Sequence, residues 1–92
     1  MNKAELIELI ANKTGTSKRQ SEECLDITIG AITKSVAKGE KVTLVGFGTF
    51  ERRDRRARKG RDPRTGVEIS IPAKKVPAFS AGKQFKEAVN KR

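Results

Sequence analysis

Apolar residues recur at helical spacing at the start of the chain. Asn2 and Glu5 have the spacing of a capping box, in which side chains satisfy the free backbone N–H groups of a helix start. The apolar positions that follow fall on one helical face: Leu6, Leu9 and Ile10. Gly15 is typical of a left-handed cap at a helix end. The pattern therefore predicts a first helix between Asn2 and Gly15.

A second helix is predicted by Ser17 and Gln20, which repeat the start signal, and by Gly39, which supplies the next stop. It carries two adjacent apolar stripes: Leu25, Thr28, Ile29, Ile32 and Val36 in one, and Cys24, Ile27 and Ala31 in the other. The thiol of Cys24 is expected to be buried there. A helix with two apolar sides needs two neighbours, and a partner subunit would supply the second. The alternative is a sheet that covers both sides within one chain.

From Lys41 onward the period of the pattern changes to two. Residues 41–44 alternate between polar and apolar, Gly46-Phe47-Gly48 breaks the run, and Thr49 and Phe50 resume it. This predicts a strand, a glycine turn and a second strand.

Residues 52–75 form a long basic segment. Gly60-Arg61-Asp62-Pro63-Arg64-Thr65-Gly66 has the residues of a turn, and residues 67–71 alternate again, which predicts a hairpin. A hairpin this polar is expected to project into solvent. Pro72 and Pro77 are expected to interrupt the returning strand. Ser80 is expected to cap a last short helix with an apolar face made of Phe85, Ala88 and Val89.

Charge is concentrated in this hairpin. Ten of its residues are Lys or Arg and three are Asp or Glu, so the segment carries +7 of the net +10 of the chain. Such a surplus favours a polyanionic partner, and nucleic acid is the first candidate. Only 35% of the 92 residues are hydrophobic, so a single chain has a small core and dimerisation would enlarge it.

The residue types argue against catalysis. The chain has no His and one Cys, so the commonest general base and a structural zinc site are absent, and an internal disulfide is excluded. We expect no enzyme activity, no catalytic residue, no metal and no cofactor. The N-terminus does not resemble a signal peptide, and no run approaches the roughly 20 apolar residues of a membrane span. The chain is expected to be cytoplasmic, with no membrane partner.

Arginine dominates the cations of the hairpin, and it suits phosphate oxygens and a narrow minor groove. Seven arginines are expected to contact nucleic acid together: Arg52, Arg53, Arg55, Arg56, Arg58, Arg61 and Arg64. No aromatic residue lies among them, which argues against modules that stack unpaired bases. Pro63 at the tip is either an ordinary turn residue or a wedge that enters a base step and kinks the duplex.

Motifs along the whole chain resemble the HU family of bacterial histone-like DNA-binding proteins. They are Gly46-Phe47-Gly48-Thr49-Phe50, the 60–66 turn, Ile71-Pro72-Ala73 and Val76-Pro77-Ala78-Phe79. The resemblance implies an intertwined dimer with two β arms that reach around DNA, each placing a proline between bases. It also implies a dimer core that contains Phe47, Phe50 and Phe79. The body would hold the DNA flanks with Lys3, Lys83 and Lys86.

The predicted fold class is α+β: a homodimer with a helical body, built from two N-terminal helices and a short C-terminal helix, and a three-stranded sheet per chain that extends into the arm. One DNA-binding domain, 1–92, would comprise a helical dimerisation part (1–40), a sheet with the arm (41–80, the arm about 52–75) and a C-terminal helix (81–92). The expected DNA-binding residues are Arg53, Arg55, Arg58, Arg61, Pro63, Arg64, Thr65, Lys74, Lys75, Lys3, Lys83 and Lys86.

The expected function is to bend, wrap and compact double-stranded DNA at the nucleoid with little sequence specificity. Bent, nicked or distorted DNA would be preferred, and a related chain could replace one subunit. A small RNA-binding protein is the competing class. The chain departs from the family at Asp62, where Asn is usual; its carboxylate either repels phosphates or shapes the tip through an Asx turn or an ion pair.

Overall fold

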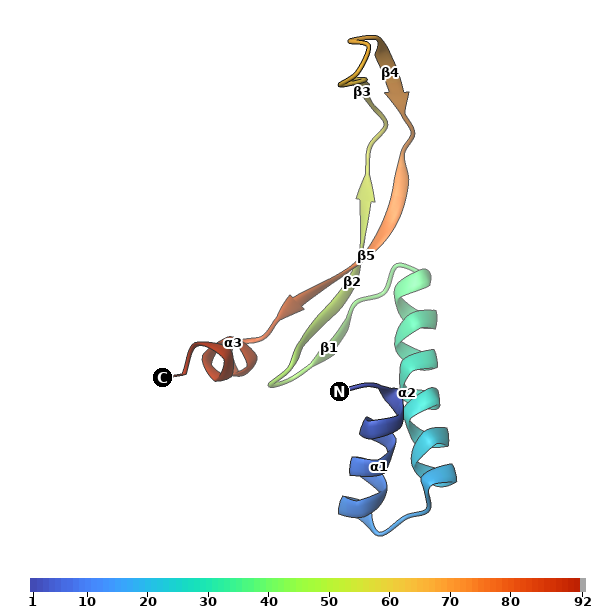
Figure 1. Ribbon diagram of the computed structural model, residues 1–92, viewed down its shortest axis with the longest axis vertical. Coiled ribbons are helices and arrows are strands. Elements are labelled where there is room, and N and C mark those ends of the chain that lie inside the picture. Colours follow the sequence, from blue (N-terminus) through green and yellow to red (C-terminus); the bar gives the residue numbers. More distant parts are fainter. Residues whose placement is uncertain (92) are drawn as a thin grey trace. The chain divides into compact units, whose positions relative to one another are not determined.

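The computed structural model describes residues 1–91, so the last residue of the predicted C-terminal segment, Arg92, lies outside the described part. The chain divides into two compact units, Met1–Lys34 and Ser35–Arg92, which are described separately. Figure 1 shows the order of the elements along the chain.

Two helices open the chain, as predicted. Helix α1 spans Lys3–Thr14, and the Asn2 side chain accepts a 2.9 Å hydrogen bond from the backbone N–H of Glu5. Gly15 ends the helix at φ +72°, in the left-handed region that glycine adopts without strain. Helix α2 spans Lys18–Ala37, and its start uses the predicted pair: the Gln20 N–H donates to the Ser17 hydroxyl at 3.0 Å.

Burial on these helices differs from the predicted stripes. In α1 the buried apolar residues are Ile7 and Ala11, one turn apart, whereas Leu9 is 40% exposed. In α2 the Cys24 thiol is exposed, so the prediction that it is buried is wrong for the single chain. Its neighbour Ile27 is 64% exposed as well. The second apolar stripe of α2 is therefore left uncovered by its own chain.

The sheet of the second unit has the strand order β1-β2-β5, with all neighbours antiparallel. The strands span Val42–Leu44, Gly48–Arg55 and Lys74–Ala81. Gly46 forms the turn between β1 and β2 at φ +88°. Pro77 does not interrupt the returning strand as predicted, because it pairs with Arg52 inside β5. β5 lies at the edge of this sheet, where a missing N–H is tolerated.

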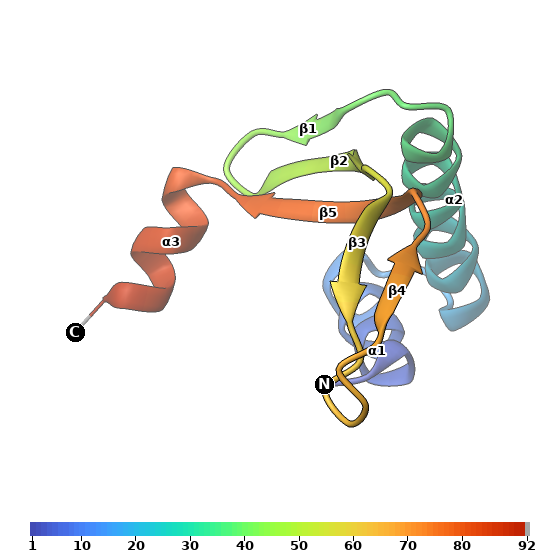
Figure 2. The ribbon, with the colours of Figure 1, turned by 90° about the horizontal axis from the view of Figure 1, so that it is seen from above.

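The hairpin continues beyond this sheet as two shorter strands. β3 spans Arg58–Arg61 and pairs with β4, Glu68–Ile71, in an antiparallel ladder. The two ladders are separated by short breaks at residues 56–57 and 72–73, so Pro72 does interrupt the returning strand. Figure 2 shows the second ladder continuing from β2 and β5. We call residues 52–75 the arm.

Helix α3, Lys83–Asn90, ends the described chain. Its N-cap is Gly82 rather than the predicted Ser80, because Ser80 remains in β5 opposite Thr49. The Gly82 N–H donates a 2.8 Å hydrogen bond to the Phe47 carbonyl, which ties the start of α3 to the β1–β2 turn. The predicted α+β class, the three-stranded sheet and its extension into an arm are confirmed.

Candidate nucleic-acid interface

The arm is an exposed hairpin covered with cations. The side chains of Arg53, Arg55, Arg58, Arg61 and Arg64 are all exposed, as are Lys74 and Lys75. Near the break between the two ladders, four cations of the arm border one surface hollow of about 420 Å³: Arg55, Arg56, Arg58 and Lys74, together with Ile71 and Pro72. Extended strands hold these charges at regular intervals, which suits the regular spacing of phosphates along a nucleic acid.

The outer ladder of the arm has two different faces. Gly60 pairs with Ile69, and a Cβ added at Gly60 would lie 3.1 Å from Cδ1 of Ile71, so glycine leaves room for that side chain. The opposite face is polar, and on it Lys59 and Glu68 form an ion pair at 3.5 Å. The side chain of Ile69 stays 45% exposed. The arm therefore presents an apolar surface as well as its charges.

The tip of the arm is organised by Asp62. Its backbone N–H donates to the Val67 carbonyl at 2.9 Å, and its carbonyl accepts from the Gly66 N–H at 2.7 Å. Its carboxylate Oδ1 accepts a 2.8 Å hydrogen bond from the Arg64 N–H, which is an Asx turn. Gly66 completes the turn at φ +71°. Pro63 is thereby held at the exposed end of the arm.

Thr65 has a structural role at the same tip. Its hydroxyl accepts a 3.3 Å hydrogen bond from the backbone N–H of Val67. Its side chain is exposed, like that of Pro63. Pro63 and Thr65, two of the residues expected to bind DNA, are therefore both accessible.

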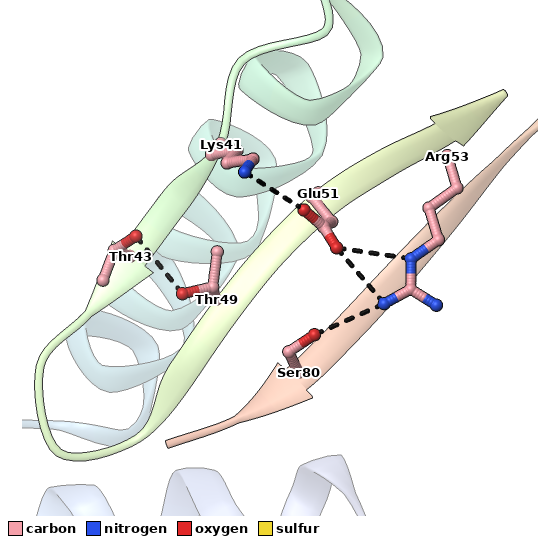
Figure 3. A network of polar contacts seen from close by, with 6 residues as sticks. All are labelled: Lys41, Thr43, Thr49, Glu51, Arg53 and Ser80. Atoms are coloured by element: carbon pink, nitrogen blue, oxygen red, sulfur yellow. Dashed lines mark hydrogen bonds and ion pairs between the residues drawn. The ribbon is translucent and has the colours of Figure 1, made fainter. Parts of the chain in front are cut away.

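A second charged surface lies on one face of the β1-β2-β5 sheet, and the residue-by-residue prediction missed most of it (Figure 3). Alternation along the strands and the observed register place ten residues on this polar sheet face: Lys41, Thr43, Thr49, Glu51, Arg53, Arg55, Lys74, Val76, Ala78 and Ser80. The alternation of polar and apolar residues was visible in the sequence. The pairing of the three strands was needed to show that these ten residues share one face.

Glu51 connects the side chains of this face. Its Oε1 accepts hydrogen bonds from Nε and Nη2 of Arg53 at 3.3 and 3.2 Å, and its Oε2 lies 3.6 Å from Nζ of Lys41. Nη2 of Arg53 also lies 3.4 Å from the Ser80 hydroxyl, and the hydroxyls of Thr43 and Thr49 are 3.3 Å apart. Arg53, an expected DNA ligand, is thus already engaged within the chain (Figure 3).

Arg52 points to the other face of the sheet, and its contacts differ from those of Arg53. Nη1 of Arg52 donates to the Ala37 carbonyl at 3.4 Å, at the C-terminal end of α2, and Nε lies 3.3 Å from Asp54. A cation at this end satisfies a free carbonyl and complements the helix dipole. These contacts give Arg52 a structural role within the chain. The expectation that it also contacts nucleic acid stays a prediction.

The lysines expected on the body differ in their surroundings. Lys3, in the first unit, forms an ion pair with Asp26 at 2.8 Å. The hydrogen bond and charge of Asp26 raise the pKa of the Lys3 ammonium above its ordinary value. Lys83 and Lys86 are exposed on α3, in the second unit.

All four phenylalanines gather on the apolar side of the second unit. The ring centroids of Phe47 and Phe79 are 5.2 Å apart, those of Phe50 and Phe79 4.8 Å, and those of Phe47 and Phe85 5.3 Å. Phe85 therefore joins the three rings expected in a dimer core. The cluster is not covered, since Phe47 is 44% and Phe79 39% exposed.

Gly48 is required beside this cluster. A Cβ at that position would lie 2.5 Å from the Ser80 carbonyl oxygen and 2.6 Å from two ring atoms of Phe79.

Within residues 1–91, no three side chains of His, Cys, Asp or Glu are grouped so that they could hold a metal ion. None of the helices described is long and apolar enough to cross a membrane.

Comparison with known proteins assigns the chain to a family. The family model described as "Bacterial DNA-binding protein" matches residues 1–90. DNA-binding protein HU of Geobacillus stearothermophilus is 53% identical over 97% of this chain and 99% of its own length. The HU protein of Staphylococcus aureus is 54% identical over the same shares.

Solved structures agree with these sequence relatives. The Anabaena HU–DNA cocrystal structure superposes with a TM-score of 0.89 at 49% identity, and each chain is covered over 100% of its length. HU from Thermotoga maritima has a TM-score of 0.70 at 38% identity, covering 98% of this chain and 100% of its own. The chain belongs to the bacterial DNA-binding protein family, that of the HU proteins.

Proposed function

We propose that this protein binds double-stranded DNA with little sequence preference, and bends, wraps and compacts it as a histone-like architectural protein. The observation that carries the proposal is the arm, an exposed hairpin of net charge +7 with a rigid proline turn at its end. Lys and Arg on such a hairpin bind phosphates and release counterions, which requires no particular base sequence. Proteins of this family bind DNA and are not enzymes.

The arm enters the minor groove, and Pro63 acts as a wedge between base pairs. The Asx turn of Asp62 and the turn closed by Gly66 hold Pro63 rigidly in an exposed position. A rigid apolar residue without a backbone donor can unstack a base step, and the bend that follows lets more DNA contact the protein. The exposed side chain of Ile69 suits the sugar edges that line a groove. Bent, nicked or distorted DNA is preferred because part of the deformation has already occurred.

The functional unit is a homodimer. The phenylalanine cluster is partly exposed in the single chain, as are Leu44 on β1 and Ile29 on α2, at 40% and 49%. Among the described residues, the buried hydrophobic side chains are Ile7, Ala11 and Val36, a very small core for a protein of this length. A second copy that covers the cluster would supply the missing burial and bring two arms to one duplex. Binding to chromosomal DNA places this dimer at the nucleoid.

A competition experiment tests the proposal. The protein is titrated against a labelled nicked duplex, with unlabelled nicked duplex, four-way junction, linear duplex or folded RNA as competitor. We expect the distorted DNAs to compete best and linear duplex to compete weakly. A folded RNA that competes better than every DNA would overturn the proposal in favour of an RNA-binding protein.

A further inference from the structure

Glu51 is the acidic member of a face that is otherwise neutral or basic. Its side chain is only 21% exposed, whereas the cations that it contacts, Lys41 and Arg53, are 72% and 58% exposed. The carboxylate is thus less accessible than the two cations, and it lies between them (Figure 3). A negative charge at this position opposes the binding of phosphates to the same face, so its presence needs an explanation.

The geometry of the ion pair between Glu51 and Arg53 explains why a carboxylate lies here. A guanidinium binds a phosphate best through two parallel N–H donors, and Nε with one Nη forms such an edge. In Arg53 this edge is occupied, because Nε and Nη2 both donate to Oε1 of Glu51. The next arginine on the polar sheet face, Arg55, forms no ion pair with any acidic side chain within residues 1–91. Two arginines of one strand thus differ in their availability.

We infer that Glu51 is a positioning residue that masks Arg53 and Lys41, so that DNA phosphates reach these cations only by displacing its carboxylate. The inference rests on the proposed DNA binding. It adds that Glu51 limits how strongly the polar sheet face binds DNA phosphates. The arm then binds first, because within residues 1–91 its arginines beyond residue 54 form no ion pair with an acidic side chain. The sheet face contributes fully only when DNA is bent onto it, because a single phosphate gains little by replacing a carboxylate of the same charge.

The test uses Glu51→Gln, which keeps the shape and removes the charge, and Glu8→Gln on the exposed part of α1 as the matched control for net charge. Both variants and the parent protein are titrated with nicked duplex across a range of salt concentrations. We expect Glu51→Gln to bind about two- to fivefold more tightly at low salt. Its plot of log K against log salt should be steeper by about 0.9 for each Arg53 released. Glu8→Gln should change both quantities much less.

A double-mutant cycle separates masking from a structural role. Arg53→Ala should cost little affinity in the parent protein, less than Arg55→Ala, and should cost clearly more in the Glu51→Gln background. A thermal unfolding curve for each variant shows whether it is folded. Since the comparison of Arg53→Ala with Arg55→Ala needs no change at Glu51, it decides the matter even where Glu51→Gln unfolds.

Two results overturn the inference: Glu51→Gln binding no more tightly than Glu8→Gln, or Arg53→Ala costing as much as Arg55→Ala in the parent protein. A parent protein that fails to bind any DNA contradicts the proposed function instead, so the two failures are distinguishable.

Discussion

The carboxylate of Asp62 accepts a 2.8 Å hydrogen bond from the backbone N–H of Arg64, and this bond closes a turn around Pro63. Of the structural roles considered for Asp62, the Asx turn is the one observed, whereas no ion pair joins it to Arg61 or Arg64 within residues 1–91. The turn needs an oxygen acceptor at this position and does not need a charge.

Asp62→Asn is therefore expected to tighten DNA binding. The Asn Oδ1 can accept the same hydrogen bond, while the repulsion between a carboxylate and the phosphates disappears. We expect a gain of about 0.5 to 1 kcal/mol per arm at low ionic strength and less at physiological salt. Titration against one nicked duplex at two salt concentrations measures both values.

Asp62→Ala is the control, because it removes the acceptor together with the charge. It should bind more weakly than Asp62→Asn, since a loosened tip must be ordered on binding. If Asp62→Asn binds no better than the parent protein at low salt, the repulsion argument fails and the charge itself shapes the arm.

Much of the fold could be predicted from the sequence because its boundaries depend on local chemistry. Gly15, Gly39 and Gly46 all adopt positive φ where the pattern indicates a turn or a helix end. The hairpin could be predicted for the same reason, since its tip combines Pro63 with Gly66. Local signals of this kind need no knowledge of distant residues.

The rest depends on distant pairing, which one sequence does not reveal. Arg52 and Arg53 are neighbours in a run of arginines, yet strand alternation sends Arg52 toward the Ala37 carbonyl and Arg53 toward Glu51. The burial of Cys24 was predicted for a covered helix, whereas its own chain leaves it exposed. Composition identified the basic segment. The register of β1, β2 and β5 was needed to tell which of its arginines lie on each face of the sheet.

Phe47→Ala or Phe79→Ala is expected to destabilise the protein by about 3 to 5 kcal/mol if a second copy buries these rings. In a single chain the cost would be smaller, because both rings are already partly exposed. Dimer dissociation and unfolding should coincide, so the melting temperature should rise with protein concentration. Calorimetry and sedimentation over a range of concentrations measure this.

The control for the phenylalanine variants is Val89→Ala, which truncates an apolar side chain that is 70% exposed on α3. It should shift the melting temperature little. Melting of the parent protein that does not depend on concentration would indicate a monomer that is stable by itself.

Affinity should fall steeply with salt, because phosphate contacts dominate the binding of a chain with net charge +10. Two arms that neutralise about 6 to 10 phosphates predict a slope of roughly 0.9 per contact in a plot of log K against log salt. Fluorescence anisotropy with a linear duplex measures the slope. A slope shallower than about 2 is incompatible with a basic arm as the main binding element.

Pro63→Ala is expected to separate DNA bending from DNA binding. The arginines of the arm remain, so affinity for a short linear duplex should stay nearly unchanged. The wedge is lost, since the small Ala side chain cannot fill an opened base step as the proline ring does. The bend and the preference for nicked over linear duplex should therefore decrease together. Energy transfer between dyes at the two ends of a duplex reports the bend, and competition between nicked and linear duplex reports the preference.

The matched control is Pro77→Ala, which removes a proline from β5 and leaves the tip intact. It should bend DNA like the parent protein, provided that its unfolding curve shows it to be folded. The Asx turn also supports the comparison, because the hydrogen bond between Asp62 and Arg64 does not involve the proline ring and should persist in Pro63→Ala. If Pro63→Ala keeps the turn at the tip but no longer bends DNA, the proline ring itself is the wedge. An unchanged bend in Pro63→Ala would instead make Pro63 an ordinary turn residue, and DNA bending would then have to come from the charges of the arm alone.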